Sequence, residues 1–251
     1  MIEINNEEKK FYDKIGKTIG WDFSSLKHKM IDNSGFKYFD EINKEINEKT
    51  ILLDIGTGGG EKLLKLISSD CLLKIGTDFS KEMVSKAEEN LKTKNQNAVF
   101  LKMNSEQIMF PNNFFDIICA RHTPFNASEV YRTLKNNGLF FSEQIDEEDC
   151  IELKNIFDRG QGYNNKIKSI DIMKKEMQSN QFKDICFYEI KQEEYYEGEE
   201  DLIFLLNHTP IIPEFGKEEK DYERFSEYVS KNKTEKGIYV ERRLFGIKAR
   251  K

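Results

Sequence analysis

The segment ILLDIGTGGGEKLLKLI, residues 51–67, joins an apolar run to a glycine-rich turn and then to a run with helical spacing. The apolar run predicts a short buried strand, because parallel strands that are covered on both faces are continuously hydrophobic. The glycines let the backbone turn sharply and approach a ligand closely, since they have no Cβ. A strand, a glycine turn and a helix N-terminus together predict a site for the sugar and charged tail of a nucleoside cofactor.

A second apolar run ends at Asp78, roughly 20 residues beyond the glycine turn. If this run forms the neighbouring parallel strand, the Asp78 carboxylate is placed to accept hydrogen bonds from a ribose diol. A nicotinamide dinucleotide site prefers G-x-G-x-x-G. Counted from Gly56, the third glycine of that motif would fall at Glu61, whose charge would repel a pyrophosphate. The pattern D-x-G-x-G-x-G, from Asp54 to Gly60, instead suits a ligand without phosphate, such as S-adenosylmethionine.

Four ordered blocks between Thr50 and Gln144 resemble those of the class I S-adenosylmethionine-dependent methyltransferases. Besides the glycine motif, these blocks are TDFSKEMVSKAEENL, VFLKMNSEQIMFPNNFFDIICARH and EVYRTLKNNGLFFSEQ. Alternating strand and helix patterns predict an α/β, doubly wound, mostly parallel sheet. The resemblance implies seven strands closed by a C-terminal antiparallel hairpin, with S-adenosylmethionine as the cofactor.

The resemblance also assigns residues to the cofactor. It implies that Asp54 and the glycines hold the methionine part, that Asp78 binds the ribose hydroxyls, and that Phe79 lies against the adenine. An Asp54 that only caps loop amides and a Phe79 that belongs to the core are the structural alternatives. The family often has Asp where Asn104 stands, and an amide can still pair with an adenine edge. The expected cofactor-binding residues are Asp54, Gly56, Gly58, Gly60, Asp78, Phe79, Asn104, Ser105, Glu106 and Arg121.

His122 is the candidate catalytic residue for acid–base chemistry. Methyl transfer mainly requires that the acceptor be held in line with the methyl group, and a base is needed only if the acceptor loses a proton. His122 follows the apolar run IICAR at the carboxyl edge of the expected sheet. Ordering of the loop HTPFN, or contact with the cofactor, is an equal alternative for His122. Arg121 could pair with the cofactor carboxylate or form a structural salt bridge.

We expect one domain over residues 1–251, with a helical cap (1–47), a cofactor-binding core (48–145) and a sheet-completing part (146–251). The expected strands are 50–55, 72–78, 98–102, 115–119 and 139–144, and the clearest helices are 80–93 and 126–134, the latter ended by 136–138. Two β-rich runs, 183–196 and 237–250, are candidates for the hairpin. They flank an acceptor-side insertion near 195–236, in which 216–236 suggests a solvated helix.

Two groups of side chains are candidates for enclosing the acceptor. His208 and the aliphatic residues around it could line an acceptor pocket, or lie on a surface helix packed against the sheet. Phe11, Tyr12 and Trp21 could form an aromatic lid, although aromatic residues more often serve ordinary packing.

The composition favours a soluble, cytoplasmic enzyme. Charged residues make up 33% of the chain and the net charge is −6, so we expect no nucleic-acid partner. No apolar run approaches the ~20 residues that cross a bilayer, and the polar, acidic N-terminus predicts no secretory signal. The four cysteines form no C-x-x-C pair, so we expect buried thiols and no metal site.

We therefore expect a methyltransferase acting on a small organic acceptor. The alternatives are an RNA or protein methyltransferase, since the middle of the chain also resembles ribosomal RNA guanine methyltransferases, and a non-catalytic S-adenosylmethionine-binding protein. Neither the acceptor nor the oligomeric state follows from the sequence.

Overall fold

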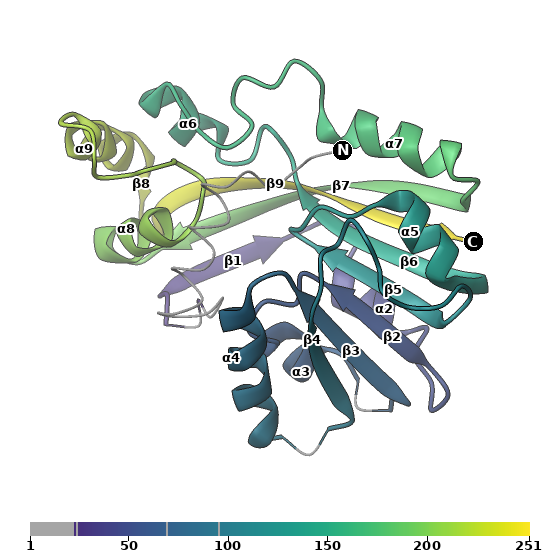
Figure 1. Ribbon diagram of the computed structural model, residues 1–251. Coiled ribbons are helices and arrows are strands. Elements are labelled where there is room, and N and C mark those ends of the chain that lie inside the picture. The colour runs from purple at the N-terminus through teal and green to yellow at the C-terminus, as the bar shows by residue number, and fades with distance from the viewer. Residues whose placement is uncertain (1–22, 24, 69, 95) are drawn as a thin grey trace.

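The computed structural model describes residues 23–251 except positions 24, 69 and 95. Within these residues, one mixed sheet has the strand order β1-β7-β9-β6-β5-β2-β3-β4, and β8 pairs with β9 beside it (Figure 1). The strands are β1 (His28–Asp32), β2 (Ile51–Ile55), β3 (Leu73–Asp78), β4 (Ala98–Lys102), β5 (Phe115–Arg121), β6 (Leu134–Ile145), β7 (Lys183–Tyr196), β8 (Lys233–Thr234) and β9 (Gly237–Arg250). The helices are α2 (Tyr38–Asn43), α3 (Glu61–Leu66), α4 (Lys81–Lys92), α5 (Ala127–Thr133), α6 (Ile151–Phe157), α7 (Ser169–Ser179), α8 (Glu199–His208) and α9 (Asp221–Asn232).

The parallel part of the sheet contains the topological switch point. Strand β2 pairs in parallel with β3 on one side and with β5 on the other. The chain thus moves outward through β3 and β4 and then returns to the far side of β2. In doubly wound sheets, ligands bind outside the carboxyl ends of the strands at such a point.

Hydrophobic residues fill both faces of this sheet. Leu52 belongs to a buried cluster with residues of α2, α3 and α4, whereas Leu53 belongs to a cluster with residues of α5 and α7. Neighbouring residues of one strand point to opposite faces, so this alternation shows helices packed on both sides. Two helices carry the side-chain caps that such sequences favour: Ser80 Oγ accepts from Met83 N, and Asn126 Oδ1 accepts from Ser128 N.

A third buried cluster lies where the long strands β7 and β9 extend beyond the parallel strands. It joins α6, α8 and α9 to the adjoining ends of β7 and β9, and includes Leu206, Phe225 and Val240 (Figure 1). The insertion between the two hairpin strands therefore has a core of its own. One face of α9 is buried there, so the segment expected as a solvated helix is amphipathic.

The α/β doubly wound fold with a C-terminal antiparallel hairpin is confirmed, and two details differ from expectation. The seven expected strands are present from β7 to β4, but β1 and β8 are added. Strand β1 occupies part of the segment expected to be helical, because it pairs with β7 and covers an edge that would otherwise be open. Helix α5 ends at Thr133, before the expected stop at 136–138, since the backbone is already extended at Leu134.

The expected N-terminal cap is only partly within the described residues. Helix α2 lies inside the expected helical cap, and it packs on the sheet through Tyr38 and Ile42. The first 22 residues of that cap, with the candidate lid residues Phe11, Tyr12 and Trp21, lie outside the described residues.

Candidate active site

The glycine turn after β2 adopts backbone conformations that favour glycine. Gly56, Gly58 and Gly60 have φ values of 70°, 58° and 74°. A Cβ on Gly56 would lie 2.5 Å from Oγ1 of Thr123, so this glycine permits a close approach to the loop after β5. A Cβ on Gly60 would lie 2.7 Å from the ring of Phe100, so Gly60 serves packing at the start of α3.

A hollow with two lobes lies at the carboxyl ends of β2, β3, β5 and β6. The β4-side lobe has a volume of about 450 Å³ and the β6-side lobe about 380 Å³. Both are within the range of small-ligand sites. The residues that line both lobes are Gly56, Asp78, Phe79, Thr123 and Pro124. These shared residues make the two lobes one continuous site.

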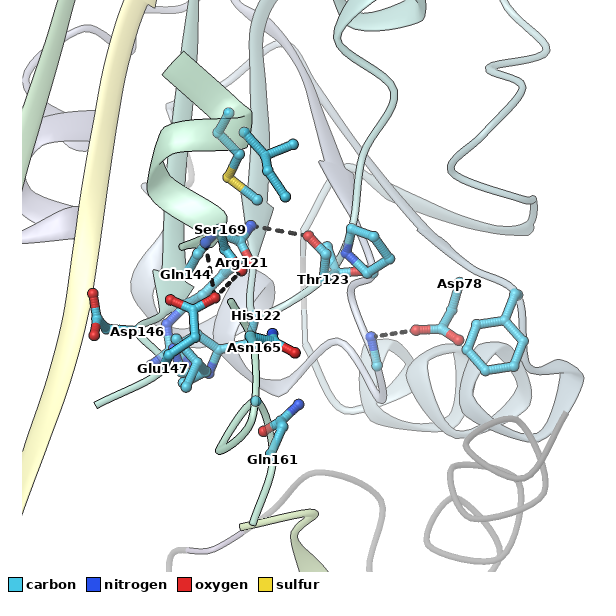
Figure 2. A pocket seen from close by; sticks show the side chains of 18 of the residues that line it. Asp78, Arg121, His122, Thr123, Gln144, Asp146, Glu147, Gln161, Asn165 and Ser169 are labelled. Carbon is cyan, nitrogen blue, oxygen red and sulfur yellow. Dashed lines mark hydrogen bonds between the residues drawn. The ribbon is translucent and has the colours of Figure 1, made fainter. Parts of the chain in front are cut away.

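Asp78 stands at the junction of the two lobes, at the end of β3. Its carboxylate accepts a hydrogen bond from Gly58 N at 3.0 Å (Figure 2) and another from Ser80 N at 2.9 Å. These two bonds fix the carboxylate against the glycine turn. Each carboxylate oxygen can accept more than one bond, so Asp78 can also bind hydroxyl groups in the hollow.

The β4-side lobe is completed by the loop between β4 and β5. Asn104, Ser105 and Glu106, which the family resemblance places near the adenine rim, line this lobe together with Ile55 and Met103. The structure thus brings the three rim candidates to the same cavity as Asp78 and Phe79.

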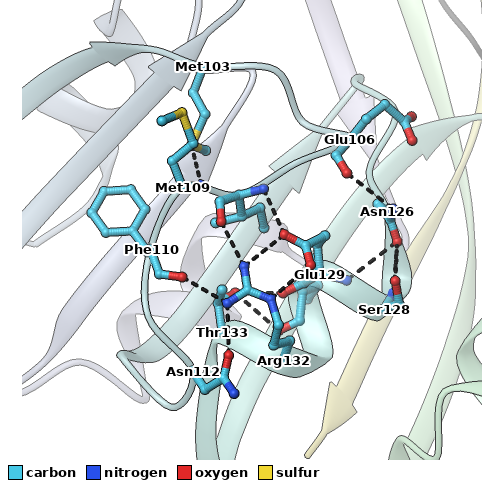
Figure 3. A network of polar contacts seen from close by, with 12 residues as sticks. Met103, Glu106, Met109, Phe110, Asn112, Asn126, Ser128, Glu129, Arg132 and Thr133 are labelled. Atoms are coloured by element: carbon cyan, nitrogen blue, oxygen red, sulfur yellow. Dashed lines mark hydrogen bonds and ion pairs between the residues drawn. The ribbon is translucent and has the colours of Figure 1, made fainter.

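Helix α5 holds this loop through a polar network (Figure 3). Arg132 donates to the carbonyl oxygens of Ile108 and Phe110, at 2.7 and 2.9 Å. Glu129 accepts from Ile108 N at 2.9 Å, and Asn126 Nδ2 donates to the carbonyl oxygen of Glu106 at 3.2 Å. The loop is therefore fixed to α5 at several backbone positions, which defines the shape of the β4-side lobe.

Asp54 lies behind the hollow and lines neither lobe. Burial raises the pKa of Asp54 to about 7, and the positive charge of Arg121 offsets only part of that effect. The buried Tyr38 hydroxyl of α2 faces the same region: burial, then Cys119 and Asp54, raise the pKa of Tyr38. The structure thus places Asp54 and Gly60 beneath the turn, and the other expected cofactor residues on the walls of the hollow.

Arg121 and His122 reach the β6-side lobe from the end of β5. Arg121 Nε donates to Oε1 of the buried Glu143 at 2.7 Å, and His122 Nε2 lies 3.4 Å from the same oxygen. Although burial would raise it, the adjacent Arg121 guanidinium holds the pKa of Glu143 at about 2. Burial, with the charge of Arg121, lowers the pKa of His122 to about 4. His122 is therefore neutral at physiological pH, and its φ of 52° points to a constrained backbone.

Sequence reasoning missed the residues that complete the β6-side lobe. They come from the end of β6, the loop before α7 and the first turns of α7, and are Gln144, Ile145, Asp146, Glu147, Gln161, Gly162, Asn165, Ile167, Ser169, Ile172 and Met173. Gln144 Nε2 donates to the carbonyl oxygen of Thr123 at 2.9 Å and joins the two walls (Figure 2). No motif marks these residues, because they are single polar or aliphatic positions spread over 30 residues of chain.

The insertion near 195–236 supports this lobe but does not line it. No residue of that segment is among those lining either cavity in the described structure. His208, expected at an acceptor pocket, instead places Nδ1 2.7 Å from the carbonyl oxygen of Phe204. The insertion holds the loop before α7, since Arg159 pairs with the buried Asp221 at 2.8 Å and Gln161 N donates to the carbonyl oxygen of Ile211.

The described part of the chain has neither a cluster of metal ligands nor a helix that could cross a membrane. No group of three or more His, Cys, Asp and Glu side chains in that part is arranged to hold a metal ion. None of its helices is both long enough and apolar enough to span a bilayer.

Part of the chain is similar to a known protein family. Residues 52–138 match a family model described as a methyltransferase domain. Over 99 residues the chain is 35% identical to the uncharacterized methyltransferase YcgJ of Bacillus subtilis, covering 36% of this chain and 38% of YcgJ. Over 134 residues it is 28% identical to the uncharacterized protein MJ1252 of Methanocaldococcus jannaschii, covering 53% and 49% of the two chains. The matches thus span about half or less of these curated relatives.

Solved structures share the fold over more of the chain. The crystal structure of YcgJ has a TM-score of 0.60 at 20% identity, covering 85% of this chain and 97% of YcgJ. The [4+2]-cyclase SpnF has a TM-score of 0.54 at 14% identity, covering 85% and 79%. At these identities the likeness concerns the fold alone. Residues 52–138 are therefore similar to a methyltransferase domain, and the chain shares its fold with YcgJ.

Proposed function

We propose that this chain is an S-adenosylmethionine-dependent methyltransferase that acts on a small organic acceptor. One observation carries the proposal: a continuous two-lobed hollow at the switch point, with the Asp78 carboxylate at the junction of its lobes. A nucleoside cofactor needs a ribose-binding acid between an adenine site and a reaction site, and the hollow has that order of features.

The residues present fit the cofactor. Phe79 and the 104–106 loop would enclose the adenine in the β4-side lobe, and Asp78 would accept bonds from the ribose hydroxyls. Gly56 lets the loop that carries Thr123 close the hollow tightly, since a Cβ on Gly56 would collide with Thr123. Glu61 begins α3, and its charge at that helix N-terminus suits a ligand without phosphate.

The chain's contribution to the reaction is mainly orientation. When bound, S-adenosylmethionine supplies a methyl group on sulfur that needs no further activation. The β6-side lobe would hold the acceptor beside it and exclude water, which is the positioning that an in-line displacement requires. Arg121 can direct further donors toward the cofactor carboxylate, because its bond to Glu143 uses one of five guanidinium donors.

His122 has two roles open to it. A histidine whose pKa is about 4 is neutral at pH 7 but holds a transferred proton weakly. This favours a neutral imidazole that positions the acceptor by hydrogen bonding. Proton abstraction by His122 suits an acceptor that loses its proton easily, and it is the second role.

Isothermal titration with S-adenosylmethionine and S-adenosylhomocysteine tests the proposal. We expect saturable one-site binding of both, and conversion of S-adenosylmethionine to S-adenosylhomocysteine that depends on an added acceptor. Absence of binding at high micromolar cofactor would remove the proposal. Binding without turnover across a broad acceptor panel would favour a non-catalytic binding protein.

A further inference from the structure

The β6-side lobe has an acidic lining. Asp78, Asp146 and Glu147 line it, and the one lining cation among the described residues is Arg121. The charge of Arg121 is balanced by its ion pair with the buried Glu143, and His122 is neutral at physiological pH. Apart from the Arg121 donors that face the cofactor carboxylate, the lobe therefore favours a group that is positively charged or donates hydrogen bonds, and it disfavours acceptors that carry a carboxylate or phosphate.

Glu147 presents an unused acceptor atom in this lobe. Its Oε1 accepts from Ser169 N at 2.8 Å and from the Ser169 hydroxyl, and so caps the start of α7 (Figure 2). Its Oε2 is buried, and no described residue donates a hydrogen bond to it. A buried acceptor without a partner is costly, so a ligand that donates to Oε2 gains free energy that another ligand does not.

The backbone around Glu147 is anchored on both sides. Lys154 Nζ donates to the carbonyl oxygen of Glu147 at 3.0 Å, and two residues further on Asp149 accepts from Arg242 Nε at 2.9 Å. The chain at Gly162 covers the side chain, since a Cβ there would lie 3.3 Å from Cγ of Glu147. These contacts and the Ser169 bonds hold the carboxylate in one orientation beside the lobe that Glu147 lines.

We infer that Glu147 Oε2 binds the nitrogen of an amine, and that the acceptors of this protein are small amines with an apolar carbon body. The inference rests on the proposed function and names its substrate class. A charge-assisted N–H bond to a carboxylate is stronger than the bond of a neutral hydroxyl. Ile145, Ile172 and Met173 supply apolar walls for the carbon body. A neutral amine held by one N–H keeps the lone pair that methyl transfer requires.

Glu147 lies apart from the residues assigned to the adenosine part. Figure 2 shows it across the hollow from Asp78, with Thr123 between them. It lines only the β6-side lobe, whereas Asp78 lines both. We therefore expect Glu147 to act on the acceptor and to leave cofactor affinity unchanged.

The test is calorimetric titration of the S-adenosylhomocysteine-loaded protein with matched pairs of amine and alcohol. The probes are n-butylamine against n-butanol and 2-phenylethylamine against 2-phenylethanol. The variants are Glu147→Gln, whose amide oxygen can keep the Ser169 bonds, and Glu152→Gln, which removes an exposed carboxylate of α6 as a control. The thermal midpoint and the S-adenosylhomocysteine affinity of each variant are measured first.

We expect the wild type and Glu152→Gln to prefer each amine over its alcohol by about tenfold or more. Glu147→Gln should reduce that preference to about twofold or less, with an unchanged midpoint and cofactor affinity. Equal or absent binding of both members of each pair to the wild type overturns the inference. So does a Glu147→Gln variant that keeps the preference, or that loses cofactor affinity instead. Failure of the wild type to bind S-adenosylhomocysteine overturns the proposed function itself, which separates the two outcomes.

Discussion

The two lobes of the hollow are built in different ways. Walls of the β4-side lobe come from short motifs at strand ends, where Gly56 follows β2 and Asp78 ends β3. The β6-side lobe is completed by residues 144–173, which contact one another only because α7 and the loop before it fold over the sheet. The comparison teaches that backbone geometry specifies the first lobe, while long-range packing specifies the second.

The two lobes also differ in what stabilises them. The loop of the β4-side lobe is held by Arg132 and Glu129 on the adjacent helix α5. The loop of the β6-side lobe is held by the distant insertion, through Arg159 and Asp221. Substitutions in the glycine turn should therefore affect the cofactor, and substitutions in the insertion should affect stability and the acceptor side.

The largest effect on cofactor affinity is expected for Gly56→Val, which changes the turn that both lobes share. The positive φ and the collision with Thr123 add strain, so affinity for S-adenosylhomocysteine should fall by more than about 100-fold. Calorimetry measures the loss. Gly35→Val is the matched control, since a Cβ at Gly35 meets nothing within 4 Å. Retained affinity in Gly56→Val would show that the turn is not close to the ligand.

Asp221→Asn should lower the stability of the protein and leave its affinity for the cofactor unchanged. Asp221 is fully buried, pairs with Arg159 and accepts from Gly216 N at 2.8 Å, so its loss leaves the partly buried Arg159 with only the exposed Glu218 as an ionic partner. We expect the free energy of unfolding to fall by about 3 kcal/mol in denaturant titrations. Cofactor affinity should stay within about twofold of the wild type, because a substitution at a distant, independent site has little effect on the cofactor-binding residues. The exposed Glu219→Gln serves as control, and a large loss of cofactor affinity in Asp221→Asn would contradict the separation.

His122→Asn should change the pH dependence of stability. The pKa of His122 is about 4 in the folded protein, against an ordinary 6.5, so the folded state binds fewer protons between these values. The stability that neutral His122 contributes is complete above pH 6.5 and is lost as pH falls toward 4, by up to about 3 kcal/mol. Asn tolerates the positive φ at this position.

Urea unfolding of the wild type and His122→Asn, at steps from pH 4 to 7, measures this effect. The difference in unfolding free energy should shift in favour of the wild type as pH rises, and level off above pH 6.5. The exposed His28→Asn variant is the comparison. If the difference in unfolding free energy between the wild type and His122→Asn does not vary with pH, then His122 is not held in its neutral form in the folded protein.

Asp78→Asn is expected to have the smallest of these effects. The amide keeps one acceptor oxygen for Gly58 N or Ser80 N but gives up the charge that ribose hydroxyls favour. Affinity for S-adenosylhomocysteine should fall by about tenfold or more, with little change in thermal midpoint. The exposed Asp70→Asn provides the control. An unchanged affinity would place the sugar elsewhere in the hollow.

The parts that could be predicted from the sequence are those that local patterns control. Apolar runs predicted the strands β2 to β5 within a few residues, and helices α4 and α5 begin within one residue of their expected starts at 80 and 126. The turn glycines and Asp78 lie at the switch point because strand ends and chain order place them there.

The remaining features depend on contacts between distant segments. Strand β1 forms because an edge of β7 is available to it, which no local pattern in residues 28–32 reveals. Glu147 becomes a site residue only when Ser169 of α7 binds its other carboxylate oxygen. The apolar run around His208 suggested a pocket, but its side chains pack together in a separate buried core.

A crystal structure of the protein with S-adenosylhomocysteine tests the central claim most directly. The account predicts ribose hydroxyls within hydrogen-bond distance of the Asp78 carboxylate, adenine in the β4-side lobe beside Phe79, and sulfur facing the β6-side lobe. A nucleoside bound outside the hollow, or a hollow filled by the protein's own side chains, would contradict it.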